Sequence, residues 1–297
     1  MNISPSSFDE YIGQGPVKKN LQVILDQKHD NYNFSLPPME HVLLSGPSGL
    51  GKTSLAEILA KSLHRPLTKK MGSQLRSPED LNFLAGEREP WSFVFIDEIH
   101  ALPLRVEEAL YEAMDEFKWK GEEISSFTLI GATTKEGELS KPLRSRFTIA
   151  ETLEPYSIED IRKIIKRSAT ILKLAIDDNA VEAIATRSRG VARIANQLLK
   201  RVGHYSSNIT ASTAQEALDN LRIDKYGLEM LDRSLLKTMR DNFDGPVGID
   251  SLAAVAGEDI STVEAREPYL VKVGFVKRTR KGRVLTAIGE DYVKSIV

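Results

Sequence analysis

A glycine-rich stretch near the start of the chain has residue types and a spacing suited to holding phosphate. Residues 46–53 read Gly-Pro-Ser-Gly-Leu-Gly-Lys-Thr, which fits the pattern G-x-x-x-x-G-K-[ST]. Its glycines let the backbone curl, so that consecutive N–H groups and the start of the next helix face an anion. Lys52 would reach the β- and γ-phosphates, and the Thr53 hydroxyl would ligate Mg²⁺. We therefore predict an ATP site made of Gly46, Gly49, Leu50, Gly51, Lys52, Thr53 and Ser54.

An acidic pair follows an apolar run in the segment "FVFIDEIH". Asp97 is expected to hold the Mg²⁺ shell together with Thr53, and Glu98 to orient or deprotonate an attacking water. The alternative is a solvated acidic pair at a strand end, but its position downstream of a phosphate-binding loop favours chemistry. A protein that only holds ATP does not need Glu98, so the pair predicts hydrolysis. His100 is expected to be a surface or packing residue, because no partner ligands lie at metal-binding spacing.

The elements that must position these residues alternate between β-rich runs and helical patterns, as a parallel α/β sheet requires. Buried strands are expected over 41–45, 92–97 and 127–134, and helices from Lys52 onward and over 105–117. Because the phosphate-binding loop and the acidic pair both follow strands, the two should face each other across one edge of the sheet.

Beyond Tyr156 the pattern changes twice. Helical patterns with no strand candidate continue to about Leu221, which predicts a small all-helical domain. From about Asp224 short helices lead into two β-rich arms, at 271–276 and 283–287, that read as a hairpin. The sequence therefore predicts three domains, with bounds at 1–156, 157–223 and 224–297.

The turn of this hairpin concentrates positive charge, with five cations in seven residues: Lys277, Arg278, Arg280, Lys281 and Arg283. A solvated basic turn is the ordinary explanation for such a run. Its place on a hairpin after a helical segment favours contact with DNA phosphates instead, which would position the protein without reading sequence.

The composition is that of an ordinary soluble globular protein. The chain has 297 residues, is 41% apolar and 28% charged, and carries a net charge of −2, so any nucleic-acid surface must be local. It has no cysteine, which excludes disulfides and thiolate metal sites. No secretion signal and no apolar run of about 20 residues is found. We expect a cytoplasmic protein without a membrane partner.

The order of motifs resembles that of the AAA+ ATPases: a P-loop, "FIDEIH", "LIGATT" at the end of a strand, then "LRSRF". In that family a polar residue that ends the third strand senses the γ-phosphate, which here implies Thr134. The arginine of the S-R-F motif, Arg146, would act as a finger in the neighbouring subunit's site and so implies a ring. Arg144 is better explained as a structural ion pair.

The match is closer to the RuvB family of Holliday-junction branch-migration motors, and it runs from about Phe8 to Ala287. It is carried by "FDEYIGQ", "GPSGLGKTSLA", "VFIDEIHAL", "LYEAMDEF", "FTLIGATTKEG", "PLRSRF", "RIANQLLKRV" and "GPVGIDSLAAVAGED…EPYLVKVGFVKRTRKGRVLTA". The resemblance implies an AAA+ P-loop parallel sheet domain, a helical lid and a C-terminal winged helix. It implies a hexameric ATPase that moves four-way junctions or duplex DNA, independently of sequence, in recombination and repair.

The resemblance also implies roles for residues that composition and spacing do not single out. Tyr11 and Ile12 would pack on the adenine, and Tyr156 would close over it from the other side. Arg193 in the lid would contact the γ-phosphate from the same subunit. The wing, at 276–284, would touch the DNA backbone.

Two positions depart from the family's pattern. The family carries a long β-hairpin that docks on a RuvA-type junction-binding protein, but here that interval is only "KWKGEEISS", 118–126. Such a short segment speaks against recruitment by RuvA. It leaves open an engineered deletion or a divergent member with another loading partner, and Trp119 is either a remnant of the hairpin or a core residue. The lid motif also lacks the family's usual proline before Arg193.

Three other functions share some of these motifs but fit the sequence less well than a motor does. An ATP-gated DNA-binding switch, of the kind found in replication initiators, would share the P-loop and winged helix, but Glu98 and Arg146 favour repeated turnover. A clamp-loader-like subunit would share the S-R motif but not the winged domain. A peptide-threading machine is disfavoured because no aromatic pore-loop motif follows the second strand.

Overall fold

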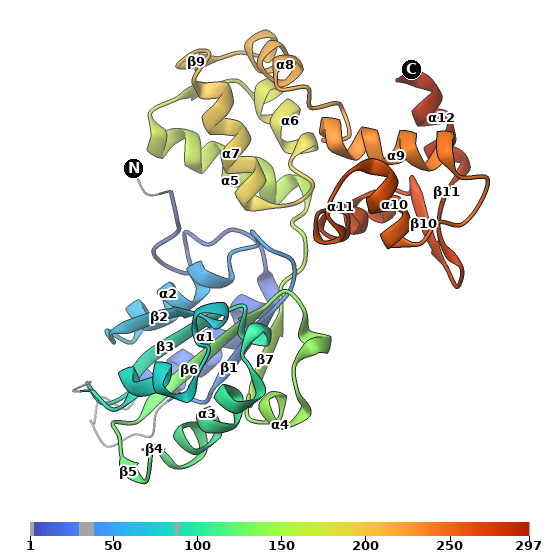
Figure 1. Cartoon of the computed structure of the whole chain (residues 1–297). Helices are drawn as coiled ribbons and strands as arrows, with labels where there is room; N and C mark the ends of the chain where they lie inside the picture. Colours follow the sequence, from blue (N-terminus) through green and yellow to red (C-terminus); the bar gives the residue numbers. More distant parts are fainter. Residues whose placement is uncertain (1–2, 30–38, 87–88, 297) are drawn as a thin grey trace. The chain divides into compact units, whose positions relative to one another are not determined.

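The computed structural model describes residues 3–29, 39–86 and 89–296, and its contacts divide into two compact units (Figure 1). The first unit is made of the described residues up to Leu172 together with Val191–Ile194, and the second of the other described residues. None of the described helices is long and apolar enough to cross a membrane.

The first unit is built on a five-stranded sheet in the order β2-β3-β6-β1-β7, and every pair of neighbouring strands is parallel. Its strands are β1 (Val42–Ser45), β2 (Leu67–Met71), β3 (Ser92–Asp97), β6 (Phe127–Thr133) and β7 (Ile149–Thr152). The three strands expected from the sequence are the three in the middle, and their side chains are buried almost without exception. The flanking strands β2 and β7 are only partly buried, which is why their sequences lack an apolar run.

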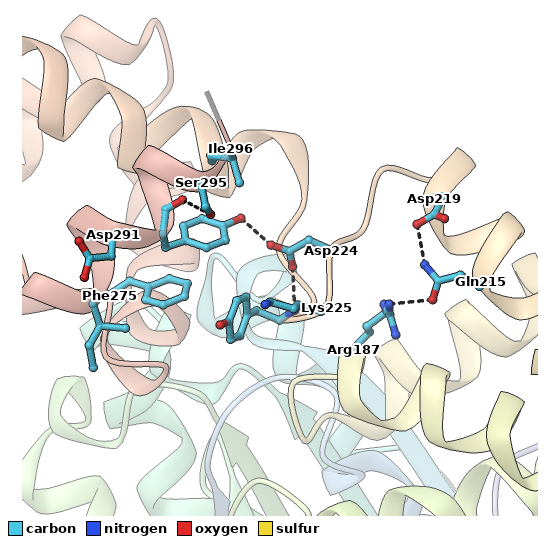
Figure 2. Close-up of a pocket in the computed structure, with 12 residues that line it drawn as sticks. Arg187, Gln215, Asp219, Asp224, Lys225, Phe275, Asp291, Ser295 and Ile296 are labelled. Carbon is cyan, nitrogen blue, oxygen red and sulfur yellow. Dashed lines mark hydrogen bonds between the residues drawn. The ribbon is translucent and has the colours of Figure 1, made fainter.

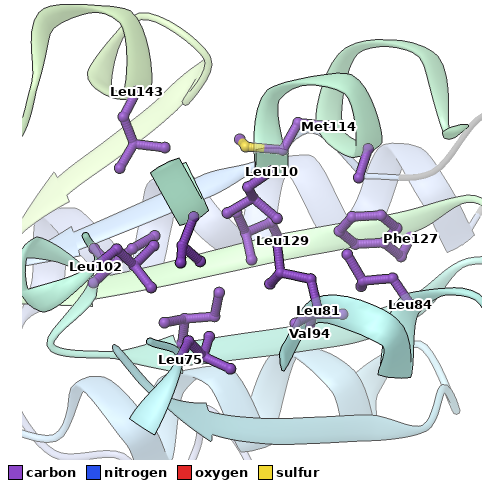
Figure 3. Packing of buried hydrophobic residues seen from close by; sticks show 14 of the residues in the cluster. Leu75, Leu81, Leu84, Val94, Leu102, Leu110, Met114, Phe127, Leu129 and Leu143 are labelled. Atoms are coloured by element: carbon purple, nitrogen blue, oxygen red, sulfur yellow. The ribbon is translucent and has the colours of Figure 1, made fainter. Parts of the chain in front are cut away.

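Helices cover both faces of this sheet, and their bounds are α1 (Gly15–His29), α2 (Lys52–Ser62), α3 (Leu104–Glu116) and α4 (Lys141–Arg144). The helix that follows β7, α5 (Ile158–Leu172), is drawn beside α7 and does not cover the sheet. Between β2 and β3 lies the 3₁₀ segment η2 (Pro78–Leu84). The apolar side of α3, with Leu110 and Met114, packs on Leu129 and Phe127 of β6 and on Leu81 of η2 (Figure 3). This packing fixes the level at which β3 and β6 end, and so fixes the residues that follow them.

A two-strand antiparallel ladder, β4 (Lys118–Trp119) with β5 (Glu122–Glu123), follows α3. Its turn consists of Lys120 at φ 54° and Gly121 at φ 79°, which suits a tight two-residue hairpin. Trp119 is buried in the main core, and its indole N–H donates to Asn82 Oδ1 at 3.1 Å. Trp119 is therefore a core residue that anchors the base of the short hairpin.

The second unit begins with the helices of the lid: α6 (Asp178–Arg187), most of α7 (Ala192–Gly203) and α8 (Ala211–Asn220). They are accompanied by one parallel pair of two-residue strands, β8 (Ala175–Ile176) and β9 (Asn208–Ile209), which the sequence analysis did not anticipate. Strands this short carry no periodic signal.

The rest of the second unit has the order of a winged helix: α9 (Met230–Asn242), α10 (Ile249–Ala256), α11 (Ile260–Lys272), β10 (Val276–Thr279), β11 (Gly282–Leu285) and α12 (Ala287–Ser295). The hairpin is shifted from the predicted arms, because Val271 and Lys272 still belong to α11, and β10 begins only at Val276 and includes Lys277 and Arg278. The apolar pattern of 271–276 combines the last residues of α11 with the buried Phe275 and Val276 at the start of the hairpin.

Candidate nucleotide site and nucleic-acid interface

The P-loop curls tightly between β1 and α2. Gly46, Gly49 and Gly51 all have positive φ, at 126°, 83° and 105°, a region that other residues rarely adopt. A Cβ on Gly46 would stand 2.4 Å from the Leu153 carbonyl oxygen, and one on Gly51 would stand 2.5 Å from the Tyr11 hydroxyl. The loop is thus a cradle that only glycine can line, as a phosphate-binding loop requires.

Lys52 points back into this loop. The residue is 6% exposed, and its ammonium group donates to the Gly46 and Pro47 carbonyl oxygens, at 2.6 and 3.1 Å. Burial lowers the pKa of Lys52, and the nearby charge of Arg193 adds to this, while the carboxylates of Glu98 and Asp97 oppose it. These two carboxylates favour the charged form of the lysine within a largely desolvated loop.

Asp97 ends β3 and is followed by Glu98 in the left-handed region, at φ 49°. Burial raises the pKa of Asp97, and the negative charge of Glu98 raises it further, against the opposing effects of the Glu98 N–H and Lys52. Carboxylate and hydroxyl oxygens are the ligands that Mg²⁺ prefers, and it takes one or two protein groups beside nucleotide phosphates. The donor set of Asp97 and Thr53, which lies in the first turn of α2, fits that ion.

Glu98 is held by the strand next to its own. One of its oxygens accepts from the Thr134 N–H at 3.1 Å and from the Thr134 hydroxyl at 2.9 Å. The same oxygen lies 3.3 Å from Nδ1 of His100, which also contacts the Thr133 hydroxyl at 3.0 Å. The predicted catalytic glutamate and the predicted sensor threonine are therefore directly bonded, and His100 belongs to the same network.

Tyr11 and Tyr156 lie together beneath the P-loop. Both hydroxyls donate to the Leu50 carbonyl oxygen, at 3.0 and 2.7 Å, and they are 3.3 Å from each other. Burial raises the pKa of both phenols, so both remain neutral donors. Neighbouring Ile12 is partly buried. In this arrangement the two tyrosines support the backbone of the loop.

Arg193 reaches the P-loop from the start of α7. Its guanidinium donates to the Ser48 hydroxyl at 2.9 Å, and its backbone N–H donates to the Gly49 carbonyl oxygen at 3.2 Å. A Cβ on Gly49 would approach Cβ of Arg193 to 2.8 Å. The arginine predicted to sense the nucleotide therefore lies against the loop predicted to bind it.

Arg146 lies apart from these groups, in the turn after α4, and is held within its own chain. Its Nε and Nη2 bond Asp115 at 2.9 and 2.8 Å, and its Nη1 donates to the Pro142 carbonyl oxygen at 2.8 Å. The guanidinium also stacks over the Tyr111 ring, 4.0 Å from its centroid. Arg144 pairs with Glu136 at 2.6 Å, as predicted for a structural residue.

The five cations of the wing fall into two sets. Arg278 and Arg283 pair across the hairpin and both bond Glu267 of α11, Arg278 at 3.0 and 2.8 Å and Arg283 at 2.6 and 3.3 Å. Glu267 is 5% exposed. Burial raises the pKa of this carboxyl, but the hydrogen bonds from Arg283 and Arg278 outweigh it, and the pKa lies below its usual range.

The other three cations, Lys277, Arg280 and Lys281, are exposed, and within 3–29, 39–86 and 89–296 their side chains have no ion pair. Alternation along β10 places Arg278 on the face toward α11, away from Lys277. Gly282 keeps the hairpin close to the body, since a Cβ there would stand 2.4 Å from the Val247 carbonyl oxygen. The wing thus presents a fixed edge with three cations available to phosphates.

Sequence reasoning missed four contributors to these sites: Ser48, His100, Thr133 and Glu267. Ser48 and Thr133 sit inside recognised motifs, but the motif patterns leave their positions open. His100 was expected to be a surface or packing residue, and its contacts with Glu98 and Thr133 depend on a neighbouring strand. Glu267 has a weak signal, a lone carboxylate near the basic hairpin, but its two partners depend on how α11 packs on the wing.

Three domain families match consecutive parts of the chain. They are the Holliday junction DNA helicase RuvB P-loop domain at residues 3–153, the RuvB AAA lid domain at 156–224, and the RuvB C-terminal winged helix domain at 225–294. A P-loop domain of this kind implies that the first site binds a nucleotide.

Similar proteins extend over nearly the whole chain. The Holliday junction branch migration complex subunit RuvB of Ligilactobacillus salivarius is 42% identical, covering 98% of this chain and 91% of that protein. Its counterpart from Lacticaseibacillus casei is also 42% identical, covering 97% and 90%. The solved structure of the Thermotoga maritima RuvB Holliday junction branch migration motor has a TM-score of 0.91 at 40% identity, covering 98% of each chain.

Proposed function

Because the chain belongs to the RuvB family of AAA+ ATPases, we propose that it is an ATP-driven DNA motor that moves the branch point of Holliday junctions. The reaction is hydrolysis of ATP to ADP and phosphate. The observation that carries turnover, as against mere binding, is the placement of Glu98, which Thr134 holds with two hydrogen bonds at the edge of the sheet.

In this proposal the P-loop N–H groups and Lys52 bind the phosphates. The ammonium now bonded to the Gly46 and Pro47 carbonyl oxygens would exchange these partners for β- and γ-phosphate oxygens. Thr53 and Asp97 would hold Mg²⁺, which supplies charge neutralisation at the phosphates when bound. Glu98 takes a proton from, or orients, the attacking water, and Thr134 fixes its carboxylate while sensing the γ-phosphate.

The base and the lid complete the site. Tyr11, Ile12 and Tyr156 would line the adenine side, from where the two tyrosines also hold the Leu50 carbonyl. Arg193 would extend from Ser48 to the γ-phosphate of the same subunit.

Arg146 implies that a complete site needs a second copy of the chain, and we propose a hexameric ring. A guanidinium delivered from the neighbouring subunit would neutralise charge developing on the γ-phosphate. Within one chain Asp115 and Tyr111 already fix its direction, so the finger does not have to be ordered when the ring forms.

In this proposal the wing contacts the DNA. Lys277, Arg280 and Lys281 supply phosphate contacts without base reading, which suits a motor that must act on any sequence. Arg278 and Arg283 contribute mainly through Glu267, by fixing the hairpin against α11.

We further propose that a RuvA-type protein does not recruit this chain through the segment after α3. The hairpin ends at Lys120 and Gly121, and the residues around its turn are exposed and charged: Lys120, Glu122 and Glu123. An apolar docking tip has no place on this ladder.

The test is ATP-dependent dissociation of a synthetic four-way junction by the protein alone over a concentration series, with Glu98→Gln as control. The motor predicts product from the native protein and none from the variant, which should lose about 10²–10⁴-fold in hydrolysis. Hydrolysis stimulated by DNA but without product, both alone and after addition of a RuvA-type protein, would contradict a motor and favour a switch.

A further inference from the structure

The turn between α6 and α7 carries two arginines four residues apart, and each contacts a different functional region. Arg193 bonds the P-loop through Ser48 and Gly49, within the first unit. Arg189 bonds the winged helix, within the second unit. The covalent chain passes from one unit to the other between these two residues.

Arg189 directs its guanidinium at the winged helix. Its Nε and Nη2 donate to the Gly227 carbonyl oxygen at 2.9 and 2.6 Å, and Nη2 also bonds Asp232 at 2.5 Å. The guanidinium stacks over the Tyr269 ring of α11, 4.6 Å from its centroid. The side chain is 10% exposed and its backbone has φ 58°, an uncommon conformation for a residue other than glycine.

Asp232, the acceptor of this bond, is fully buried in the first turn of α9. It also accepts from the Glu229 N–H at 2.8 Å and pairs with Arg266 at 3.3 Å. A buried carboxylate that loses a charged partner is left poorly compensated, so the site strongly favours keeping Arg189 in place. The lid turn is thereby tied to the first helix of the winged domain.

The same joint is closed by backbone packing at Gly227, whose Cβ, if present, would stand 2.5 Å from the Arg187 carbonyl oxygen. Beside this clamp a cavity of about 520 Å³ lies between Gln215 and Asp219 of α8 and Asp291 of α12 (Figure 2).

The end of the lid also contacts α9 through Arg222, whose carbonyl oxygen accepts from Arg233 at 2.5 Å. That contact is exposed, whereas the Arg189–Asp232 ion pair is almost completely buried. The buried contact between the lid and the winged helix is therefore the one that Arg189 makes.

We infer that Arg189 is a positioning residue that makes the lid helices α6–α8 and the winged helix one mechanical body, so that a change at Arg193 is carried to the wing. This inference rests on the proposed motor function. Only Gly190, Val191 and Ala192 separate the two arginines, and such a stretch spans at most about 13–14 Å. A displacement of Arg193 that exceeds this slack must move Arg189 and, through Asp232, α9.

The test compares Arg189→Met with Arg187→Met. Both changes remove a largely buried guanidinium, but among the described residues the side chain of Arg187 bonds only lid groups, the Ala183 carbonyl oxygen and Gln215. We expect Arg189→Met to hydrolyse ATP within about twofold of the native rate while junction product per ATP falls about tenfold or more. Arg187→Met should keep the native ratio. An unchanged ratio in Arg189→Met, or an equal loss of hydrolysis, would overturn the inference.

Two further measurements keep the outcome decisive. If Arg189→Met does not fold, Asp232→Asn, which keeps the shape and the bond from the Glu229 N–H, should lower the same ratio. If the native protein yields no junction product, the proposed function fails, and the inference is then decided by hydrogen exchange of α9 amides. ATP should change their protection in Glu98→Gln but not in Glu98→Gln with Arg189→Met. Equal responses in the two proteins would refute the coupling.

Discussion

The P-loop and the wing both carry cations that we propose to bind phosphates, and they hold them in opposite ways. Lys52 is 6% exposed and bonded to two backbone carbonyls, in a loop shaped by glycines that no other residue can replace. Lys277, Arg280 and Lys281 stand in solvent on an exposed strand and turn. Hydrogen bonds thus fix the position of the Lys52 ammonium group itself. In the wing the hairpin backbone is fixed, but the three cationic side chains are free to move in solvent.

The difference agrees with the functions proposed for the two regions. Phosphoryl transfer depends on placement within a fraction of an ångström, which requires buried partners and a rigid backbone. Contact with the DNA backbone depends on charge and tolerates displacement, because it is long-range and screened by salt. In the wing the buried interaction lies behind the exposed cations: Glu267 of α11 pairs with Arg278 and Arg283 and so fixes the hairpin.

Gly51→Ala should break the nucleotide side most severely. The new Cβ would stand 2.5 Å from the Tyr11 hydroxyl at a φ of 105°, so the loop must shift or the tyrosine must leave its bond to Leu50. With strain of about 1–3 kcal/mol, ATP affinity should fall about tenfold or more. Titration with a fluorescent ATP analogue measures this. Gly137→Ala, where a Cβ meets nothing within 4 Å, is the matched control and should bind normally.

On the wing, removal of the three exposed cations sharpens the contrast. The triple change Lys277→Ala, Arg280→Ala and Lys281→Ala should lower duplex affinity about tenfold and reduce the slope of log K against log salt by up to about 3, since each lost phosphate contact removes about 0.9. ATP hydrolysis without DNA should be unchanged. The double change Arg278→Ala and Arg283→Ala, which removes the paired cations, should lower the slope less. An equal drop in both would mean that the pairing with Glu267 does not divide the wing.

The smallest effect is expected from Glu267→Gln, and it depends on pH. The folded-state pKa of Glu267 is lowered, so its ion pairs stabilise the protein above the unfolded value of about 4.3 and stop doing so as the pH falls through the folded value. The native protein should unfold at a higher temperature than the variant at pH 7, with the gap closing below about pH 4. A gap that persisted at low pH would show that the loss is one of packing and not of charge.

The nucleotide site was the part most open to prediction, because its motifs are local. The P-loop, the acidic pair and Thr134 each lie on one strand end, and a parallel sheet brings strand ends together. The flanking strands β2 and β7 were not predicted, because strands that are only partly buried lack the apolar run that indicates a buried strand. The hairpin arm expected at 271–276 was wrong except for Val276, because an apolar run that spans the end of α11 and the start of β10 resembles a strand over so few residues.

Groups that act through another element could not be found in the sequence. His100 reaches Glu98 and Thr133 only because β3 and β6 are neighbours, and Arg189 reaches Asp232 across 43 positions. For a titratable or basic residue outside a motif, no sequence pattern indicates which distant residue it will contact in the fold. The lid turn containing Arg193 was assigned from resemblance, yet Arg189 in the same turn carried no such signal.

The short ladder after α3 lies outside the five-stranded sheet that carries the nucleotide site. Its base is anchored by the hydrogen bond from Trp119 to Asn82. Its two strands are joined by a two-residue turn and pair with each other as a separate ladder. Length can be added or removed at Lys120 and Gly121 while the buried anchor stays as it is. In evolution, a docking element can therefore be gained, lost or exchanged at this turn without changes in the ATPase core. In engineering terms it is a place to graft one.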